Sequence, residues 1–216
     1  MDDVLKELLE YKRCFIFDLD GTLADTERLH WVAHNEILKK EYGIEVDREH
    51  ILSYLGKPEE VFLSEIEADY NITIENKEKY SKKRAKLALK IILNESKPFD
   101  FIKEVLTTSS FGIRFFLVSA QNKGVAIKIL KKWGLYSYFN EYNSFFCNKD
   151  YPVKSDYYKK IMDILETASP NEVVLFEDVD KYLSIAKEHG FITIGIDSGF
   201  GEPITKADFV IDTRTK

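Results

Sequence analysis

Two aspartates that stand two positions apart, Asp18 and Asp20, follow an apolar stretch and precede a glycine. The apolar residues 14–17 are typical of a short buried strand, so both carboxylates are expected in a loop at the end of that strand. Neighbouring carboxylates repel each other, and their burial is costly, unless a cation or hydrogen-bond donors compensate their charge. Mg²⁺ prefers oxygen ligands of this kind. A common Asp-Gly turn after a strand would leave the same pattern, and these residues alone leave that alternative open.

Two later apolar runs also end in residues that could do chemistry. Residues 113–118 lead into Ser119, and residues 173–176 lead into Glu177 and Asp178. In a parallel sheet the carboxyl ends of the strands meet at one edge, and ligands bind there. We therefore expect these polar groups to converge with the two aspartates that follow the first strand.

The second half of the chain alternates apolar runs with helical patterns. Strands or short apolar runs are predicted at 113–118, 145–147, 173–176, 191–196 and 209–211, and helices at 101–106, 123–133, after 154 and at 181–189. Nearly continuous apolar strands that alternate with helices indicate a parallel sheet covered on both faces. The sequence therefore predicts an α/β core, a Rossmann-like doubly wound parallel sheet.

The segment between the first strand and this alternating region has a helical pattern throughout. Helices are predicted at 31–42, from 47, at 58–70 and at 75–93, with glycine and proline turn signals between them. We expect an inserted helical cap domain over residues 24–96, with the core formed by residues 1–23 and 97–216. The connections near Ala24 and Lys97 are expected to act as hinges.

Composition narrows the classes of partner. The formal net charge of −6 and the isoelectric point near 5.4 argue against a surface for nucleic acid or anionic membrane, which needs clustered positive charge. The two cysteines, Cys14 and Cys147, form no disulfide framework and fit a reducing compartment. With no apolar segment of about 20 residues to span a membrane, we expect a cytoplasmic protein that acts as a monomer on a small molecule.

The motifs together resemble those of a known family. Asp18-Leu19-Asp20-Gly21-Thr22, Ser119, Lys154 and Glu177-Asp178 are similar to the four motifs of the haloacid dehalogenase-like hydrolase superfamily. The resemblance runs from Cys14 over nearly the whole chain and is closest to the phosphoglucomutase- and phosphoglycolate phosphatase-like branch, which carries a helical cap. It implies a Mg²⁺-dependent phosphatase that hydrolyses a small phosphorylated metabolite through an aspartyl-phosphate.

The resemblance also implies roles for the acidic residues. Asp18 would be the nucleophile, and Asp20 would be the general acid for the leaving group and then the base for water. The branch that cleaves haloacids lacks the second aspartate, so Asp20 favours phosphate esters. Mg²⁺ would be held by Asp18, Asp178 and the backbone carbonyl of Asp20. Glu177 would bind the metal directly, bind it through water or support the other ligands.

The remaining predicted site residues would contact the phosphate or the substrate. Ser119 and the backbone amide of Ala120 would donate hydrogen bonds to phosphoryl oxygens. Lys154 would neutralise negative charge on the phosphate and the nucleophile, with Lys149 as the alternative. His30, which lies in the similar stretch Asp25-Thr26-Glu27-Arg28-Leu29-His30, would contact substrate.

Two alternatives to hydrolysis remain. A sugar-phosphate mutase of the β-phosphoglucomutase type would use the same nucleophile, and a catalytically idle phospho-ligand-binding module would keep only the fold. The sequence departs mildly from the family pattern at Val179 and Asp180. We expect Asp180 to be an N-cap for the helix that follows it.

Overall fold

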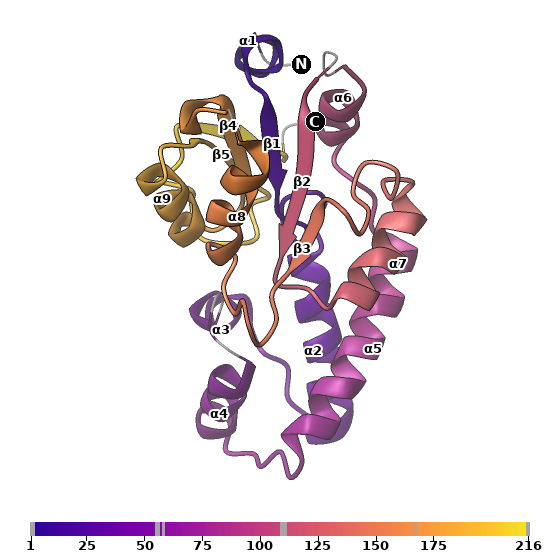
Figure 1. Ribbon diagram of the computed structural model, residues 1–216. Helices are drawn as coiled ribbons and strands as arrows, with labels where there is room; N and C mark the ends of the chain where they lie inside the picture. Colours follow the sequence, from indigo (N-terminus) through magenta and orange to yellow (C-terminus); the bar gives the residue numbers. More distant parts are fainter. Residues whose placement is uncertain (1–2, 55–56, 58, 109–111, 167, 215–216) are drawn as a thin grey trace. The chain divides into compact units, whose positions relative to one another are not determined.

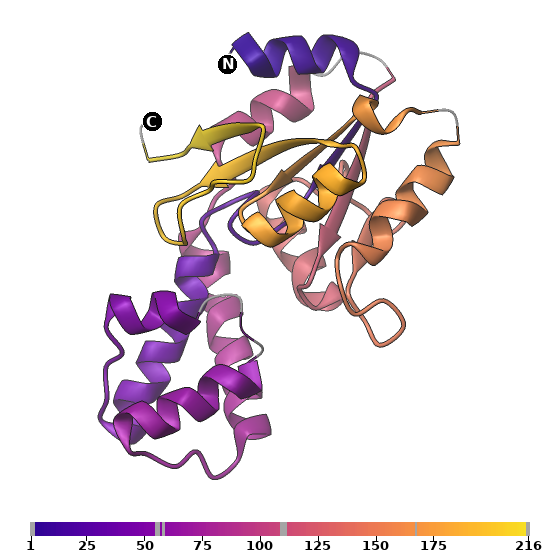
Figure 2. The same cartoon turned by 90° about the vertical axis from the view of Figure 1, so that its left-hand side faces the viewer.

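A computed structural model of the chain describes residues 3–54, 57, 59–108, 112–166 and 168–214. The chain divides into two compact units, which Figures 1 and 2 show as an α/β part and a helical part. One unit comprises Met1–Asp25 and Lys97–Lys216, and the other comprises Thr26–Ser96.

The first unit is built on a six-stranded parallel sheet with the order β3-β2-β1-β4-β5-β6. Its strands are β1 (Cys14–Phe17), β2 (Arg114–Ser119), β3 (Ser144–Phe146), β4 (Val173–Glu177), β5 (Ile192–Asp197) and β6 (Phe209–Asp212). The first strand lies between β2 and β4, and its last residue, Phe17, is in register with Leu117 and Phe176. The predicted doubly wound parallel sheet is confirmed.

Five described helices of this unit accompany the strands. They are α1 (Asp3–Tyr11), α6 (Asp100–Thr108), α7 (Lys123–Trp133), α8 (Asp156–Leu165) and α9 (Asp180–Glu188), and a 3₁₀ turn, η1 (Pro170–Glu172), precedes β4. The bounds of α7 are those that the sequence predicts. Asn122 caps its start by accepting hydrogen bonds from two backbone amides, and Gly134 ends it in the left-handed conformation.

Both faces of the central strands are buried, which explains their continuous apolar sequences. On one face Ile16, Val118 and Leu175 pack with residues of α8 and α9. Side chains alternate along a strand, so Phe17 and Phe176 lie on the other face, where their rings stack with centroids 4.5 Å apart. Burial on both sides of β1 and β4 fixes the positions of the residues that follow these two strands.

The prediction that Asp180 caps α9 is wrong. The N-cap residue is Val179, and the Asp180 carboxylate accepts hydrogen bonds from the backbone amides of Thr205 and Lys206 at 3.0–3.1 Å. The Asp180 carboxylate therefore accepts hydrogen bonds from a distant loop, whereas an N-cap side chain would accept from the first amides of its own helix. Although partial burial raises the pKa of this carboxyl, a hydrogen bond from the Thr205 hydroxyl at 2.6 Å and the two backbone hydrogen bonds outweigh it and hold the pKa below the ordinary value.

The second unit is a bundle of α2 (Glu27–Tyr42), α3 (Arg48–Tyr54), α4 (Glu59–Tyr70) and α5 (Lys77–Glu95). The residue Pro58, where a helix was expected to begin, lies outside the described residues. The long helix α5 begins two residues later than predicted, after Asn76, whose side chain accepts from the backbone amide of Lys79 at 2.8 Å. The apolar pattern of this helix predicts that the bundle is held together by Ala85, Leu87, Ala88, Leu89, Ile91 and Ile92. Of these, Ala88, Ile91 and Ile92 are buried. Ala85 is instead exposed.

Aromatic side chains form much of the interior of this helical unit. The ring of His34 lies 4.9 Å from that of Phe62 and 5.7 Å from that of Tyr80, measured between centroids. Its Nδ1 lies 2.9 Å from the Tyr80 hydroxyl. His34 is therefore a packed, hydrogen-bonded core residue. In the described part of the chain, no helix is both long and apolar enough to cross a membrane.

Candidate active site

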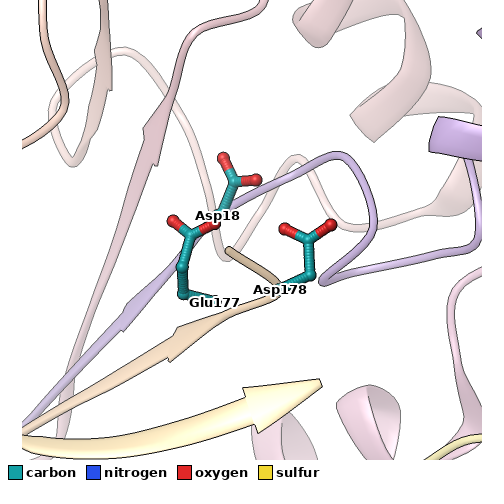
Figure 3. Close-up of side chains that lie close together, drawn as sticks. All are labelled: Asp18, Glu177 and Asp178. Carbon is teal, nitrogen blue, oxygen red and sulfur yellow. The ribbon is translucent and has the colours of Figure 1, made fainter. Parts of the chain in front are cut away.

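The ends of β1 and β4 bring three carboxylates together (Figure 3). Asp18 follows β1, Glu177 ends β4 and Asp178 comes next, and one oxygen from each lies within 4.8 Å of the others. The register of the two strands explains this convergence, because the backbone amide of Asp18 donates to the carbonyl of Phe176 at 3.1 Å. Asp18 and Glu177 are buried. The arrangement is a compact set of oxygen donors at the carboxyl edge of the sheet.

Lys154 inserts its ammonium group between two of these carboxylates. It lies in the turn just before α8, and its Nζ is 3.0 Å from Oδ2 of Asp18. The same Nζ donates to both oxygens of Glu177, at 2.8 and 3.1 Å. Lys149, the alternative that the sequence left open, is exposed. Lys154 is thus the lysine that contacts the predicted nucleophile.

Burial and mutual charge set the protonation of this cluster. Loss of hydration raises the pKa of Asp18 well above its ordinary value, and the nearby Glu177 and Asp20 add to that rise. Burial likewise raises the pKa of Glu177 to about 8. Although burial lowers the pKa of Lys154, the adjacent Asp18 and Glu177 carboxylates outweigh it and raise that pKa well above its ordinary value. The site therefore strongly favours positive charge beside its carboxylates.

Gly21 allows the loop after β1 to pass close to Asp178. Its φ is +76°, a conformation that favours glycine, and a Cβ at this position would overlap the Asp178 carboxylate. The hydroxyl of Thr22 lies 3.5 Å from Oδ1 of the same carboxylate. The Asp-x-Asp-Gly-Thr pattern therefore has a local physical reason, since only a glycine leaves room for Asp178.

The loop after β2 joins Ser119 to Asp20 through Gln121. The Oγ of Ser119, a buried residue, accepts from the backbone amide of Gln121 at 3.0 Å. The side-chain amide of Gln121 donates to Oδ2 of Asp20 at 3.2 Å, and its oxygen accepts from the backbone amide of Asn122 at 3.0 Å. These bonds fix which end of the amide faces Asp20. Ala120 is exposed beside Ser119.

The structure brings some of the predicted site residues together and leaves others apart. Asp18, Glu177, Asp178 and Lys154 lie together. The carboxylate of Asp20 lies outside the three-carboxylate group that the described residues form, and it contacts Gln121 instead. His30 belongs to the helical unit, where its Nδ1 lies 3.4 Å from Arg84, so its contact with substrate stays a prediction.

Two residues near the site were not assigned a role from the sequence. Gln121 stands two positions after Ser119 and contacts Asp20. Tyr182 stands four positions after Asp178, and its ring lies 4.6 Å from Nζ of Lys154. Asp178 precedes Val179, the N-cap of α9, so helical spacing gave no signal for Tyr182. No sequence pattern points to Gln121.

Comparisons with known proteins identify the family and the fold. A family model described as haloacid dehalogenase-like hydrolase matches residues 15–196. A solved structure of a conserved haloacid dehalogenase-like protein of unknown function from Agrobacterium tumefaciens is 21% identical, with a TM-score of 0.76 and 94% of each chain covered. CbbY from Rhodobacter sphaeroides, solved in complex with phosphate, is 20% identical, with a TM-score of 0.74 and 94% of each chain covered.

A third similar structure is a β-phosphoglucomutase from Clostridium difficile. It is 22% identical to this chain, with a TM-score of 0.69, and the match covers 94% of this chain and 91% of the other. At such identities these structures establish a shared fold.

Proposed function

Because the chain belongs to the haloacid dehalogenase-like hydrolase family, we propose that it is a Mg²⁺-dependent phosphatase. Its substrate is a small phosphorylated metabolite, and the reaction passes through an aspartyl-phosphate on Asp18. The observation that carries this proposal is the contact of Lys154 with Asp18 at 3.0 Å, beside the buried carboxylate of Glu177 and the half-buried carboxylate of Asp178. A buried nucleophilic carboxylate beside a fixed cation suits attack on an anionic phosphoryl group.

The proposed reaction has two steps. First, an oxygen of the Asp18 carboxylate attacks phosphorus, and the bond from phosphorus to the substrate's alkoxide oxygen breaks while Asp20 protonates that oxygen. Asp20, now ionised, then takes a proton from water, whose oxygen attacks phosphorus and releases inorganic phosphate from Asp18. The same carboxyl group therefore acts as acid in the first step and as base in the second.

Ser119 and Lys154 would bind the transferred group. The Oγ of Ser119 accepts from the Gln121 amide, so its own hydrogen remains to be donated to a phosphoryl oxygen. The backbone amide of Ala120 is the second proposed donor. The ammonium of Lys154 would offset the negative charge that gathers between the nucleophile and the phosphate.

The donor set fits Mg²⁺. Asp18, Glu177 and Asp178 offer only carboxylate oxygens, the ligands that a hard divalent cation prefers. We propose that Asp18, Asp178 and the Asp20 carbonyl hold the ion, with Glu177 either a ligand or a partner of Lys154. When bound, the ion would supply charge stabilisation to the phosphoryl group.

The helical unit is proposed to be a cap that selects the substrate, with residues 24–96 forming it and residues 1–23 and 97–216 forming the core. Substrate contact through His30 belongs to this proposal. Both cysteines are free thiols, which supports a cytoplasmic location. We propose that the protein acts there as a monomer.

Release of inorganic phosphate tests the function. Purified protein with Mg²⁺ should hydrolyse at least one compound in a panel of sugar phosphates, nucleotides and phosphoglycolate. The variant Asp18→Asn, whose amide is a poor nucleophile, should abolish turnover while keeping the wild-type fold. Activity of Asp18→Asn within tenfold of wild type would remove Asp18 from the proposed role.

A mutase is the second candidate, favoured by the similarity to the β-phosphoglucomutase structure. A mutase moves phosphate between two positions of one sugar phosphate and must exclude water. Nuclear magnetic resonance of phosphorus during turnover distinguishes the two, because a mutase gives an isomeric sugar phosphate and a phosphatase gives inorganic phosphate. A binding module would give neither product.

A further inference from the structure

The ring of Tyr182 is the third group that surrounds the Lys154 ammonium. Tyr182 lies in the first turns of α9, and its ring centroid is 4.6 Å from Nζ of Lys154. The other two groups are the carboxylates of Asp18 and Glu177. The lysine side chain is 7% exposed, so this contact lies in a largely dry environment.

We propose that Tyr182 is a positioning residue whose ring face holds the Lys154 ammonium against Asp18. An aromatic face attracts a cation within about 6 Å through its quadrupole, and the attraction grows when water is excluded. The ring leaves the N–H groups of the lysine to its carboxylate partners, because those oxygens are the stronger acceptors. It also occupies space that water would otherwise fill beside the ammonium.

The lysine side chain is flexible, so the contact with the ring affects where its ammonium group lies. Four methylene groups separate the ammonium from the backbone, and Glu177 competes with Asp18 for it with two oxygens. A smaller aliphatic side chain at position 182 would open room for the ammonium to move away from Asp18. Tyr182 contacts no reacting atom in the proposed mechanism, so its effect passes through Lys154.

The chain contains a matched pair outside the site. Nζ of Lys131, in the last turn of α7, lies 4.7 Å from the ring centroid of Tyr136, which follows that helix. The cation–ring distance is nearly the same as at Lys154, although Lys131 is exposed. Lys181 also lies over Tyr182, at 5.7 Å, and is exposed. Tyr136→Leu therefore controls for loss of a cation–ring contact in general, and Lys181→Met controls for the second lysine near the same ring.

The catalytic consequence of this inference rests on the proposed function. With a phosphate ester that the wild type hydrolyses, Tyr182→Leu should lower kcat about fivefold and change KM less. Tyr182→Phe keeps the ring face, so its kcat should stay within about twofold of wild type. The two control variants, Tyr136→Leu and Lys181→Met, should also keep kcat within about twofold of wild type. Wild-type kcat in Tyr182→Leu, or equal losses in the Leu and Phe variants, would overturn the inference.

A spectroscopic measurement tests the contact without any substrate and without a variant of Tyr182. In protein labelled with ¹³C at the lysine ε carbon, the ε protons of Lys154 should resonate upfield because they face an aromatic ring; Lys154→Met identifies the signal by its loss. An unshifted signal overturns the inference whatever the activity. A shifted signal in a protein that hydrolyses no phosphate ester supports the contact and refutes the proposed function instead.

Discussion

The side-chain amide of Gln121 donates to Oδ2 of Asp20 at 3.2 Å, although the two residues stand 101 positions apart. The amide oxygen of Gln121 accepts from a backbone amide, so the NH₂ group must face Asp20. A donor at this place holds Oδ2 and fixes the orientation of the carboxyl group. Gln121 therefore orients the proposed general acid and base.

Gln121→Leu should lower kcat about tenfold, because a single hydrogen bond to a charged group is typically worth about 1.5–3 kcal/mol and Asp20 would be less well oriented. Gln121→Glu, which puts a carboxylate beside Asp20, should lower it further. Asn122→Ala is the control, since it should cost about 1 kcal/mol of stability by removing the cap of α7 while leaving kcat close to wild type. Equal kcat in all three variants would exclude an orienting role for Gln121.

Asp20→Asn should lower turnover about 10²–10⁴-fold, because general acid–base catalysis typically contributes that much. Its side chain lies outside the three-carboxylate group, so the variant should retain metal binding. The check is kcat on an ester with a poor leaving group beside kcat on one with a good leaving group. The loss should be smaller for the good leaving group, which needs less protonation; the same loss for both would argue against the acid role.

Chelation should silence the enzyme, and added Mg²⁺ should restore it, because three acidic side chains lie together at the proposed metal position and their oxygens are the ligands that Mg²⁺ prefers. Ca²⁺ should be a poor substitute, since its looser and higher coordination misplaces the attacking oxygen. Phosphate release with EDTA, with excess Mg²⁺ and with excess Ca²⁺ is the measurement. Full activity in the chelated sample would refute metal dependence.

Gly21→Ala should impair metal binding before it unfolds the protein. The new Cβ would overlap the Asp178 carboxylate, and the alanine backbone would have to adopt a φ of +76°. The conformational strain alone is about 1 kcal/mol, and displacement of Asp178 adds to the functional loss. Calorimetric Mg²⁺ titration should show a weaker affinity than for Gly43→Ala, whose added Cβ meets no atom within 4 Å and whose φ of +71° is similar. Matching affinities would contradict the packing argument.

The sequence was sufficient to predict those parts of the molecule that periodicity and strand ends control. Apolar strands such as β1 and β4 are buried on both faces, so their composition reveals a covered parallel sheet, and their ends reveal where Asp18 and Glu177 lie. Helix α7 was predicted to the residue because Asn122 and Gly134 mark its ends by local chemistry.

Interactions between distant loops could not be predicted in the same way. Asp180 accepts from the backbone amides of residues 205 and 206, and Gln121 donates to Asp20. Neither pairing produces a periodic pattern in the sequence. Ala85 shows a different limit. It is an apolar residue of helix α5 between Arg84 and Lys86, yet it is exposed, and the face that packs is that of Ala88 and Ile92. Pattern alone did not settle which apolar face of this helix is covered.

The buried histidine of the helical unit predicts how that unit responds to acid. Burial lowers the pKa of His34 well below 6.5, and the positive charge of Arg84 and the neighbouring His30 lower it further. Between the folded and unfolded pKa values, the unfolded chain binds a proton at this position that the folded chain does not. Stability should therefore be complete above about pH 6.5 and should fall as the pH decreases below it, by up to about 1.4 kcal/mol per pH unit from this group.

Urea unfolding at pH 7.5, 6.0 and 5.0 measures this dependence. The chain has two tryptophans, so in a Trp133→Phe background the fluorescence of Trp31, whose ring lies 5.1 Å from that of His34, reports on the helical unit. His34→Gln removes the titrating ring, so its free energy of unfolding should be lower than wild type at pH 7.5 but should decrease less on acidification. The difference between wild type and variant should thus narrow toward pH 5. A constant difference over the three pH values would show that His34 does not carry the acid sensitivity of this unit.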